Sequence, residues 1–215
     1  MSTRLTASEL ESLGLVAIIR SRVDADFGAA ARSLQTGGMR AMEITLNTPG
    51  ALQAIEQLRR DKTIKLRVGA GTILNAEDAE NAVQAGAEFL VTPTLQLDTI
   101  AFCQENQIPL LCGCMTPTEA LTAHQAGADF IKLFPANTLG PGYVRSLRGP
   151  LPFLKIEPTG GVSLENLADF VHAGCVGAAI GSELVSQEIL NHADWETLTN
   201  RARQFVDCFE AARRG

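Results

Sequence analysis

The amino-acid sequence predicts an α/β protein whose strands and helices form one (β/α)8, or TIM, barrel over residues 1–215. Three observations support this prediction. Eight short apolar runs recur along the chain, alanine-rich segments with helical spacing separate them, and several helix-to-strand joints repeat the same small residues. Eight parallel strands close into a barrel, and a doubly wound open sheet is the alternative. No low-complexity linker interrupts the series, so a single domain is expected.

The predicted strands are near-continuous runs of β-branched and other apolar residues, each bounded by glycine, proline or asparagine. Such runs are typical of parallel strands that helices cover. In chain order they are LVAIIR (15–20), AMEITL (41–46), IKLRVGA (64–70), AEFLVT (87–92), IPLLCG (108–113), ADFIKLF (128–134), FLKIEPT (153–159) and VGAAIG (176–181).

The helices between these strands carry their own start and stop signals. DADFGAAARSLQTGG (24–38) and NAEDAENAVQAGA (75–87) begin with Asp or Asn caps and end at glycine. The joints QAGAEFLV (84–91), QAGADFIK (125–132) and HAGCVGAA (172–179) share the same small residues. This repetition indicates one βα unit used several times.

Composition and charge exclude several function classes. The chain is 46% hydrophobic and 20% charged, and its net charge of -6 argues against nucleic acid or an anionic membrane surface as the main partner. The first residues are polar without an apolar signal-peptide core, and no run is long enough to cross a bilayer. Five cysteines in unpatterned positions indicate reduced thiols. We therefore expect a cytoplasmic protein.

In such a barrel, the carboxyl ends of all strands face one common mouth, where catalytic residues lie. Polar or glycine-rich residues recur at that end of the predicted strands. They are Arg20, Glu43 within the second strand, GAGT (69–72), Thr92-Pro93, CGCMTPTE (112–119), Lys132 on the sixth strand, PTGG (158–161) and GS (181–182).

Glu43 and Lys132 are charged residues inside apolar strands. Strand alternation gives Glu43 the orientation of Ala41 and Lys132 that of Phe130, so both side chains can meet in the lumen. A buried structural ion pair is one interpretation, and a partly solvated lysine that contacts phosphate is another. The sharper hypothesis is carbonyl chemistry, because desolvation lowers the pKa of a lysine and yields a nucleophilic amine, while a nearby carboxylate transfers protons.

Glycine-rich segments after the seventh and eighth strands form a second candidate site. PTGGV (158–162) precedes the predicted helix SLENLADFVHAG (163–174), and IGSELV (180–185) is expected to open the last helix. In barrels, backbone N–H groups at this position commonly bind phosphate. Ordinary turn formation is the alternative for either loop alone.

Metal chemistry has little support in the sequence. His124, His172 and His192 fall in helical or terminal segments without metal-ligand spacing, so no metal site is predicted. Cys112 and Cys114 form a C-x-C pair at the end of the fifth strand. We expect them to be small side chains lining the site rather than a soft-metal or redox pair, because no third soft ligand is apparent.

Six segments, in order along the chain, resemble motifs of the KDPG/KHG aldolase family. They are MEITLNTP (42–49), RVGAGTILNAEDA (67–79), FLVTP (89–93), CMTPTEA (114–120), IKLFPA (131–136) and EPTGGVSLENL (157–167). Members of this family cleave 2-keto-3-deoxy-6-phosphogluconate (KDPG) or 4-hydroxy-2-oxoglutarate (KHG). The resemblance extends from AIIR (17–20) to IGSELV (180–185), which is nearly the whole chain.

The resemblance implies a class I aldolase that needs no cofactor, is usually a homotrimer, and binds a small 2-keto-4-hydroxy acid and pyruvate. It places Lys132 at the Schiff-base position and Glu43 at the general acid/base position. It also implies the substrate-binding residues: Arg20 and Thr72 near the substrate carboxylate, Pro93 and Phe134 shaping the pocket, and Thr159, Gly160, Gly161, Gly181 and Ser182 around the phosphate.

One position departs from many members of the family. They have arginine in a TLRT motif, whereas this chain has Asn47 in TLNT, as do enzymes for the galactonate epimer of KDPG. The resemblance therefore leaves KDPG, its galactonate epimer and KHG open as substrates. Two rival classes are a phosphate-binding epimerase or decarboxylase barrel that uses Lys132 only as a cation, and a non-catalytic metabolite-binding barrel.

Overall fold

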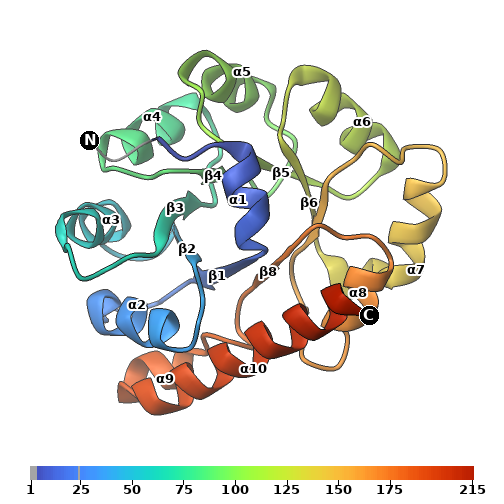
Figure 1. The fold of residues 1–215 in the computed structure, drawn as a ribbon. Coiled ribbons are helices and arrows are strands. Elements are labelled where there is room, and N and C mark those ends of the chain that lie inside the picture. Colours follow the sequence, from blue (N-terminus) through green and yellow to red (C-terminus); the bar gives the residue numbers. More distant parts are fainter. Residues whose placement is uncertain (1–3, 24) are drawn as a thin grey trace.

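A computed structural model describes residues 4–23 and 25–215, and a parallel sheet of eight strands forms the centre of this part of the chain (Figure 1). The order of the strands around the sheet is β7-β6-β5-β4-β3-β2-β1-β8. Their bounds are β1 Leu15–Ile19, β2 Ala41–Thr45, β3 Arg67–Gly71, β4 Leu90–Val91, β5 Leu110–Cys114, β6 Phe130–Leu133, β7 Ile156–Pro158 and β8 Ala178–Ile180.

The two ends of this strand order, β7 and β8, meet and close the barrel. The Val176 N–H donates to the Ile156 carbonyl at 3.0 Å, and Thr159 pairs with Ala179 in a parallel bridge. Closure confirms the predicted (β/α)8 barrel and rules out the open doubly wound sheet.

Helices alternate with the strands and surround the sheet (Figure 1). As predicted, Asp26 and Asn75 cap the helices that follow them, accepting from the N–H groups of Ala29 and Asp78 at 2.7 and 2.8 Å. The helices are α1 Ala7–Leu13, α2 Phe27–Thr36, α3 Ala51–Arg60, α4 Ala76–Gln84, α5 Leu97–Asn106, α6 Pro117–Ala126, α7 Ala136–Arg148, α8 Leu167–His172, α9 Gln187–His192 and α10 Trp195–Arg214.

The repeated small-residue joints adopt one shared conformation. Gly86, Gly127 and Gly174 follow the ends of α4, α6 and α8 with φ angles of 100°, 104° and 100°. A side chain at these positions would be strained, so glycine is required where each of these helices turns into the next strand. The structure thus confirms the repeat unit that the sequence indicates.

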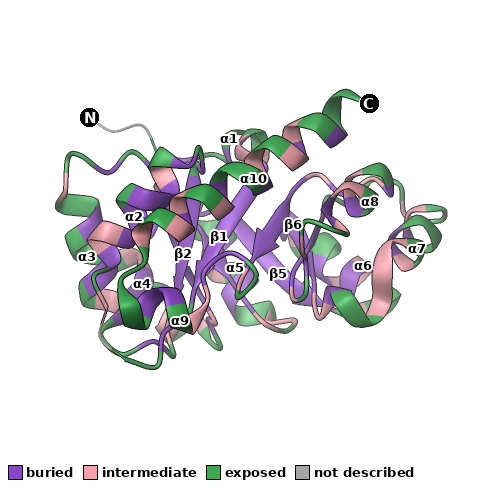
Figure 2. Ribbon diagram, turned by 90° about the horizontal axis from the view of Figure 1, so that it is seen from below, coloured by how far each residue is buried: buried purple, intermediate pink, exposed green. Residues whose placement is uncertain are grey.

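Both faces of the strands are buried, which explains their continuous apolar character. Figure 2 shows buried strands inside a layer of helices whose outer faces are exposed. Alternate residues such as Val16, Leu111 and Phe130 pack together in the lumen, while their neighbours pack against the helices. The strands are shorter than the predicted apolar runs. Ahead of β3, for example, Ile64 and Leu66 are buried but do not belong to the strand.

Helix α1 closes the amino-terminal end of the lumen. Figure 1 shows α1 lying across the centre of the barrel, and Leu5 and Leu10 pack in the lumen cluster with 2% exposure each. Thr6 and Glu9 form a capping box that starts this helix. This helix was not predicted, although Thr6 and Glu9 form the T-x-x-E pattern that is typical of a helix start.

One predicted helix start is wrong. IGSELV (180–185) does not open a helix, because the N–H groups of Leu184 and Val185 both donate to the Gly181 carbonyl and form a single turn. Helix α9 starts later, at Gln187, where the Ser186 hydroxyl accepts from the Ile189 N–H at 3.3 Å. Ser186 provides the N-cap that the segment around Ser182 lacks.

Across the described residues, no helix combines the length and apolar character needed to span a membrane.

Candidate active site

Glu43 on β2 and Lys132 on β6 both project into the barrel lumen. They share the lumen-facing set of their strands with Ala41 and Phe130, which belong to the lumen cluster. Their exposed fractions are 1% and 5%. The structure therefore brings the two predicted reactive groups into one buried compartment.

Burial is the main influence on the pKa of both groups. Desolvation raises the pKa of Glu43, and the positive charges of Lys132 and Arg20 oppose this change. Desolvation lowers the pKa of Lys132, Glu43 opposes this, and the nearby Arg20 adds to the lowering. No direct ion pair joins Glu43 to Lys132, and Glu43 Oε2 has no hydrogen-bond partner among the described residues. The interpretation as a structural ion pair is thus not supported, and burial makes the Lys132 ammonium easier to deprotonate than an exposed one.

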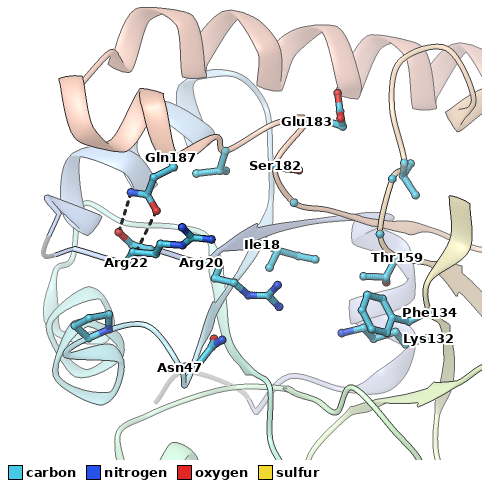
Figure 3. A pocket seen from close by; sticks show the side chains of 17 residues that line it. Ile18, Arg20, Arg22, Asn47, Lys132, Phe134, Thr159, Ser182, Glu183 and Gln187 are labelled. Carbon is cyan, nitrogen blue, oxygen red and sulfur yellow. Dashed lines mark hydrogen bonds between the residues drawn. The ribbon is translucent and has the colours of Figure 1, made fainter.

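A cavity of about 780 Å³ opens above Lys132 at the carboxyl ends of the strands (Figure 3). Lys132 Nζ lies 5.3 Å from the centroid of the Phe134 ring. Figure 3 shows Arg20 extending from the end of β1 toward the middle of the cavity. The lining residues are Ile18, Arg20, Ser21, Arg22, Asn47, Pro49, Lys132, Phe134, Thr159, Gly160, Gly161, Val162, Gly181, Ser182, Glu183, Val185 and Gln187.

The predicted phosphate loops line one side of this cavity. Among the described residues, no protein acceptor is found for the backbone N–H groups of Gly161, Ser182 and Glu183. Gly161 has a φ of 72°, and a Cβ there would lie 2.4 Å from the Asn137 Cβ, so only glycine fits. Free N–H groups in a turn form an anion-binding concavity even without a full helix start.

Two predicted substrate-binding residues do not line this cavity. Thr72 follows β3 with a φ of 59°, and Pro93 follows β4, where its carbonyl carbon would be 2.3 Å from a Cβ at Gly113. At the same end of β3, a Cβ at Gly71 would lie 2.7 Å from the Glu43 carboxyl carbon. The GAGT and Thr-Pro motifs therefore shape the lumen around Glu43 and the neighbouring strands.

Cys112 and Cys114 do not line the site, contrary to the expectation from the sequence. They pack in the cluster between the sheet and the helices, while Leu111 of the same strand faces the lumen. Strand alternation explains the difference, since odd-numbered residues of β5 point inward. Within the described residues, no group of His, Cys, Asp and Glu side chains is arranged to hold a metal ion.

Sequence reasoning missed residues that shape the mouth. Gln187 at the start of α9 accepts from the Arg22 N–H at 3.1 Å and donates to the Ser21 hydroxyl at 3.5 Å, as the dashed lines in Figure 3 show. These contacts join residues far apart in sequence, and no local pattern predicts them. Glu157 was also missed, although it is a charged residue within an apolar strand, the same signal that identified Glu43 and Lys132.

Comparisons with known proteins agree with this geometry. The family model for "KDPG and KHG aldolase" matches residues 6–201. A 2-dehydro-3-deoxy-phosphogluconate aldolase of Pseudomonas aeruginosa is 35% identical over 192 residues, which are 89% of this chain and 87% of that enzyme. A 2-dehydro-3-deoxy-6-phosphogalactonate aldolase of Escherichia coli is 36% identical over 173 residues, 80% of this chain and 84% of that enzyme.

A solved structure connects the fold to a covalent intermediate. The KDPG aldolase of Legionella pneumophila, crystallised with pyruvate captured at low pH as a covalent carbinolamine, superposes with a TM-score of 0.84. It is 25% identical to this chain, and the alignment covers 93% of this chain and 97% of that one.

Proposed function

The chain belongs to the KDPG and KHG aldolase family, and we propose that it cleaves KDPG to pyruvate and glyceraldehyde 3-phosphate through a Schiff base on Lys132. The observation that carries this proposal is a buried lysine, Lys132, at the base of the cavity, with Glu43 in the same lumen. Lys132 is almost inaccessible to solvent and lacks an ion-pair partner among the described residues. Burial lowers its pKa, so the uncharged amine is available as a nucleophile.

The reaction follows from these two side chains. The Lys132 amine attacks the C2 ketone of the substrate to give a carbinolamine, which loses water and becomes a protonated imine. Glu43 accepts the C4 hydroxyl proton while the C3–C4 bond breaks, and the imine takes up the bonding electrons. The aldehyde leaves, the enamine regains a proton at C3, and water releases pyruvate and the free lysine.

The cavity supplies partners for both ends of this substrate. Arg20 forms no ion pair with a described residue and presents its charge to the cavity, which suits the substrate carboxylate. We assign Phe134 to the pocket wall. Thr72 and Pro93 lie outside the cavity lining, and in this proposal they act on the substrate site through the shape of the lumen. The phosphate is assigned to Thr159, Gly160, Gly161, Gly181 and Ser182. The buried Thr159 hydroxyl lacks a hydrogen-bond partner among the described residues, which supports that assignment.

Three substrates are candidates, and their relative rates decide the physiological role. KHG would give pyruvate and glyoxylate by the same steps. The galactonate epimer stays a candidate because Asn47 is exposed at the cavity mouth, and because the Escherichia coli phosphogalactonate aldolase is about as similar to this chain as the Pseudomonas aeruginosa KDPG aldolase. Pyruvate release from KDPG, its epimer and KHG should be measured side by side. Turnover of none of them would refute the proposed function, while a higher kcat/KM on the epimer would reassign the substrate.

The epimerase or decarboxylase alternative predicts no covalent bond between enzyme and substrate. If Lys132 acted only as a cation, Lys132→Arg would retain its charge and much of its activity. The aldolase mechanism predicts a loss of several orders of magnitude instead, because a guanidinium stays protonated.

We also propose that the protein assembles as a homotrimer. Leu74, Leu97 and Met115 are exposed apolar side chains with 51%, 54% and 42% exposure, and they follow three consecutive strands, β3 to β5. Apolar side chains gathered on one part of the rim are typical of an interface. Light scattering in solution gives the mass directly, and a monomer would contradict this proposal.

A further inference from the structure

Glu157 is a third carboxyl group in the lumen, and the mechanism above does not use it. It pairs in register with Lys132 across the neighbouring strands β7 and β6, so both side chains project to the same face. Glu157 is 2% exposed, forms no hydrogen bond with any described residue, and its Oε2 atom is fully buried. Strands in a sheet are about 5 Å apart, so the two side chains leave neighbouring strands side by side. A Cβ at Gly177 would lie 3.3 Å from the Glu157 carboxyl carbon, which places the carboxyl between β6 and the start of β8.

Other ionisable groups face Glu157 from the surrounding elements. Glu43 on β2 shares the lumen with Glu157. Glu11 of α1 is also close enough to affect the Glu157 carboxyl, and its own carboxylate pairs with Lys155 at 2.8 Å. Cys175, in the loop that precedes β8, is also close enough for its ionisation to be disfavoured by Glu157. Lys155 is engaged by Glu11, so Lys132 is the unpaired cation nearest in register to Glu157 among the described residues.

An unpartnered carboxyl in this position is costly to maintain. Burial raises the pKa of Glu157 to about 8, and the negative charges of Glu43 and Glu11 add to that effect. At neutral pH the group is therefore mainly the uncharged acid. Buried, unsatisfied ionisable groups next to a reactive centre are often retained for function rather than stability.

We propose that Glu157 is a positioning residue for the aldolase reaction: as an uncharged acid it leaves the Lys132 amine free, and as a carboxylate it retains the proton of the Lys132 ammonium. This inference rests on the proposed Schiff-base role of Lys132. The two forms differ because a second carboxylate beside Lys132 favours its charged state. Glu157 thus raises the lower limit of the pH range in which the lysine is nucleophilic.

The test is the pH dependence of imine formation with pyruvate alone. Wild type, Glu157→Gln and Glu157→Met would be mixed with subsaturating pyruvate between pH 6 and 10 and quenched with borohydride at set times. The trapped adduct would be counted by mass spectrometry. Glu165→Gln, which removes an exposed carboxylate from the β7–α8 loop, is the control for net charge.

The rate of imine formation should rise with pH. Removing the Glu157 carboxyl should move the midpoint of that rise to lower pH by about one pH unit. The Gln and Met variants should shift together, because both lack the charge, and Glu165→Gln should coincide with wild type. Coincident profiles for wild type and both Glu157 variants, or a shift in only one of the two, would overturn the inference. Absence of any adduct in wild type would overturn the proposed function and this inference with it, so the two failures are distinguishable.

Discussion

Replacing Glu157 by glutamine tests how strongly the lumen disfavours charge. The amide has nearly the shape of the protonated acid but cannot ionise. The pKa of Glu157 is raised from an ordinary value of 4.5 to about 8 by burial, with Glu43 and Glu11 adding to the effect. A folded-state pKa above the unfolded value means that the stability present below pH 4.5 is lost as the pH rises toward 8. Wild type therefore loses stability over this range, and Glu157→Gln does not.

The size of the difference follows from the pKa change. At about 1.4 kcal/mol for each pKa unit, the rise corresponds to at most about 5 kcal/mol at pH 8 and to about 3 kcal/mol at pH 7. Urea unfolding of both proteins at pH 5, 6, 7 and 8, at one protein concentration, measures the free energy of unfolding. The advantage of Glu157→Gln should grow with pH. A difference that stays constant from pH 5 to 8 would refute the reasoning, because Glu157 would then not ionise more readily in the unfolded chain.

The remaining predictions concern the reacting groups and the phosphate loops. Glu43→Gln should still form the pyruvate adduct while cleavage falls by about 10²–10⁴-fold, because only the proton transfer is lost; near-normal turnover would reassign the base. Ser182→Glu, on the exposed turn after β8, should sharply lower kcat/KM for a phosphorylated substrate but leave KHG much less affected, through repulsion. Equal losses on both substrates would mean that the turn does not bind phosphate. Gly161→Val should lower the melting temperature and the rate on KDPG, since a Cβ there meets Asn137 and the φ angle is positive; unchanged melting would contradict this account of the loop.

The barrel itself was predictable from local patterns. Eight apolar runs and the repeated glycine joints follow from the local preferences of strands and helix ends, and residues such as Gly127 are required by backbone conformation. Glu43 and Lys132 were predictable for a related reason. A charged residue in an otherwise apolar strand is visible in the sequence, and strand alternation fixes the face to which it points.

Other features depend on contacts between distant segments. The packing of Leu10 into the lumen fills a gap that exists only once the barrel has closed. The bond between Gln187 and the Arg22 N–H joins residues at opposite ends of the chain. Cys112 lies near the mouth but points away from the lumen, so the expectation that it lines the site was wrong. Strand alternation alone predicts the correct face.

Mapping the site of borohydride trapping tests the central claim most directly. Wild-type protein would be incubated with pyruvate, reduced and digested, and the peptide that contains Lys132 would be sequenced by mass spectrometry. The account predicts one reduced pyruvate on Lys132 and none on Lys155, which is bound to Glu11, and no adduct in Lys132→Arg. A trapped pyruvate on another lysine, or full activity without any adduct, would contradict the assignment of Lys132 as the nucleophile.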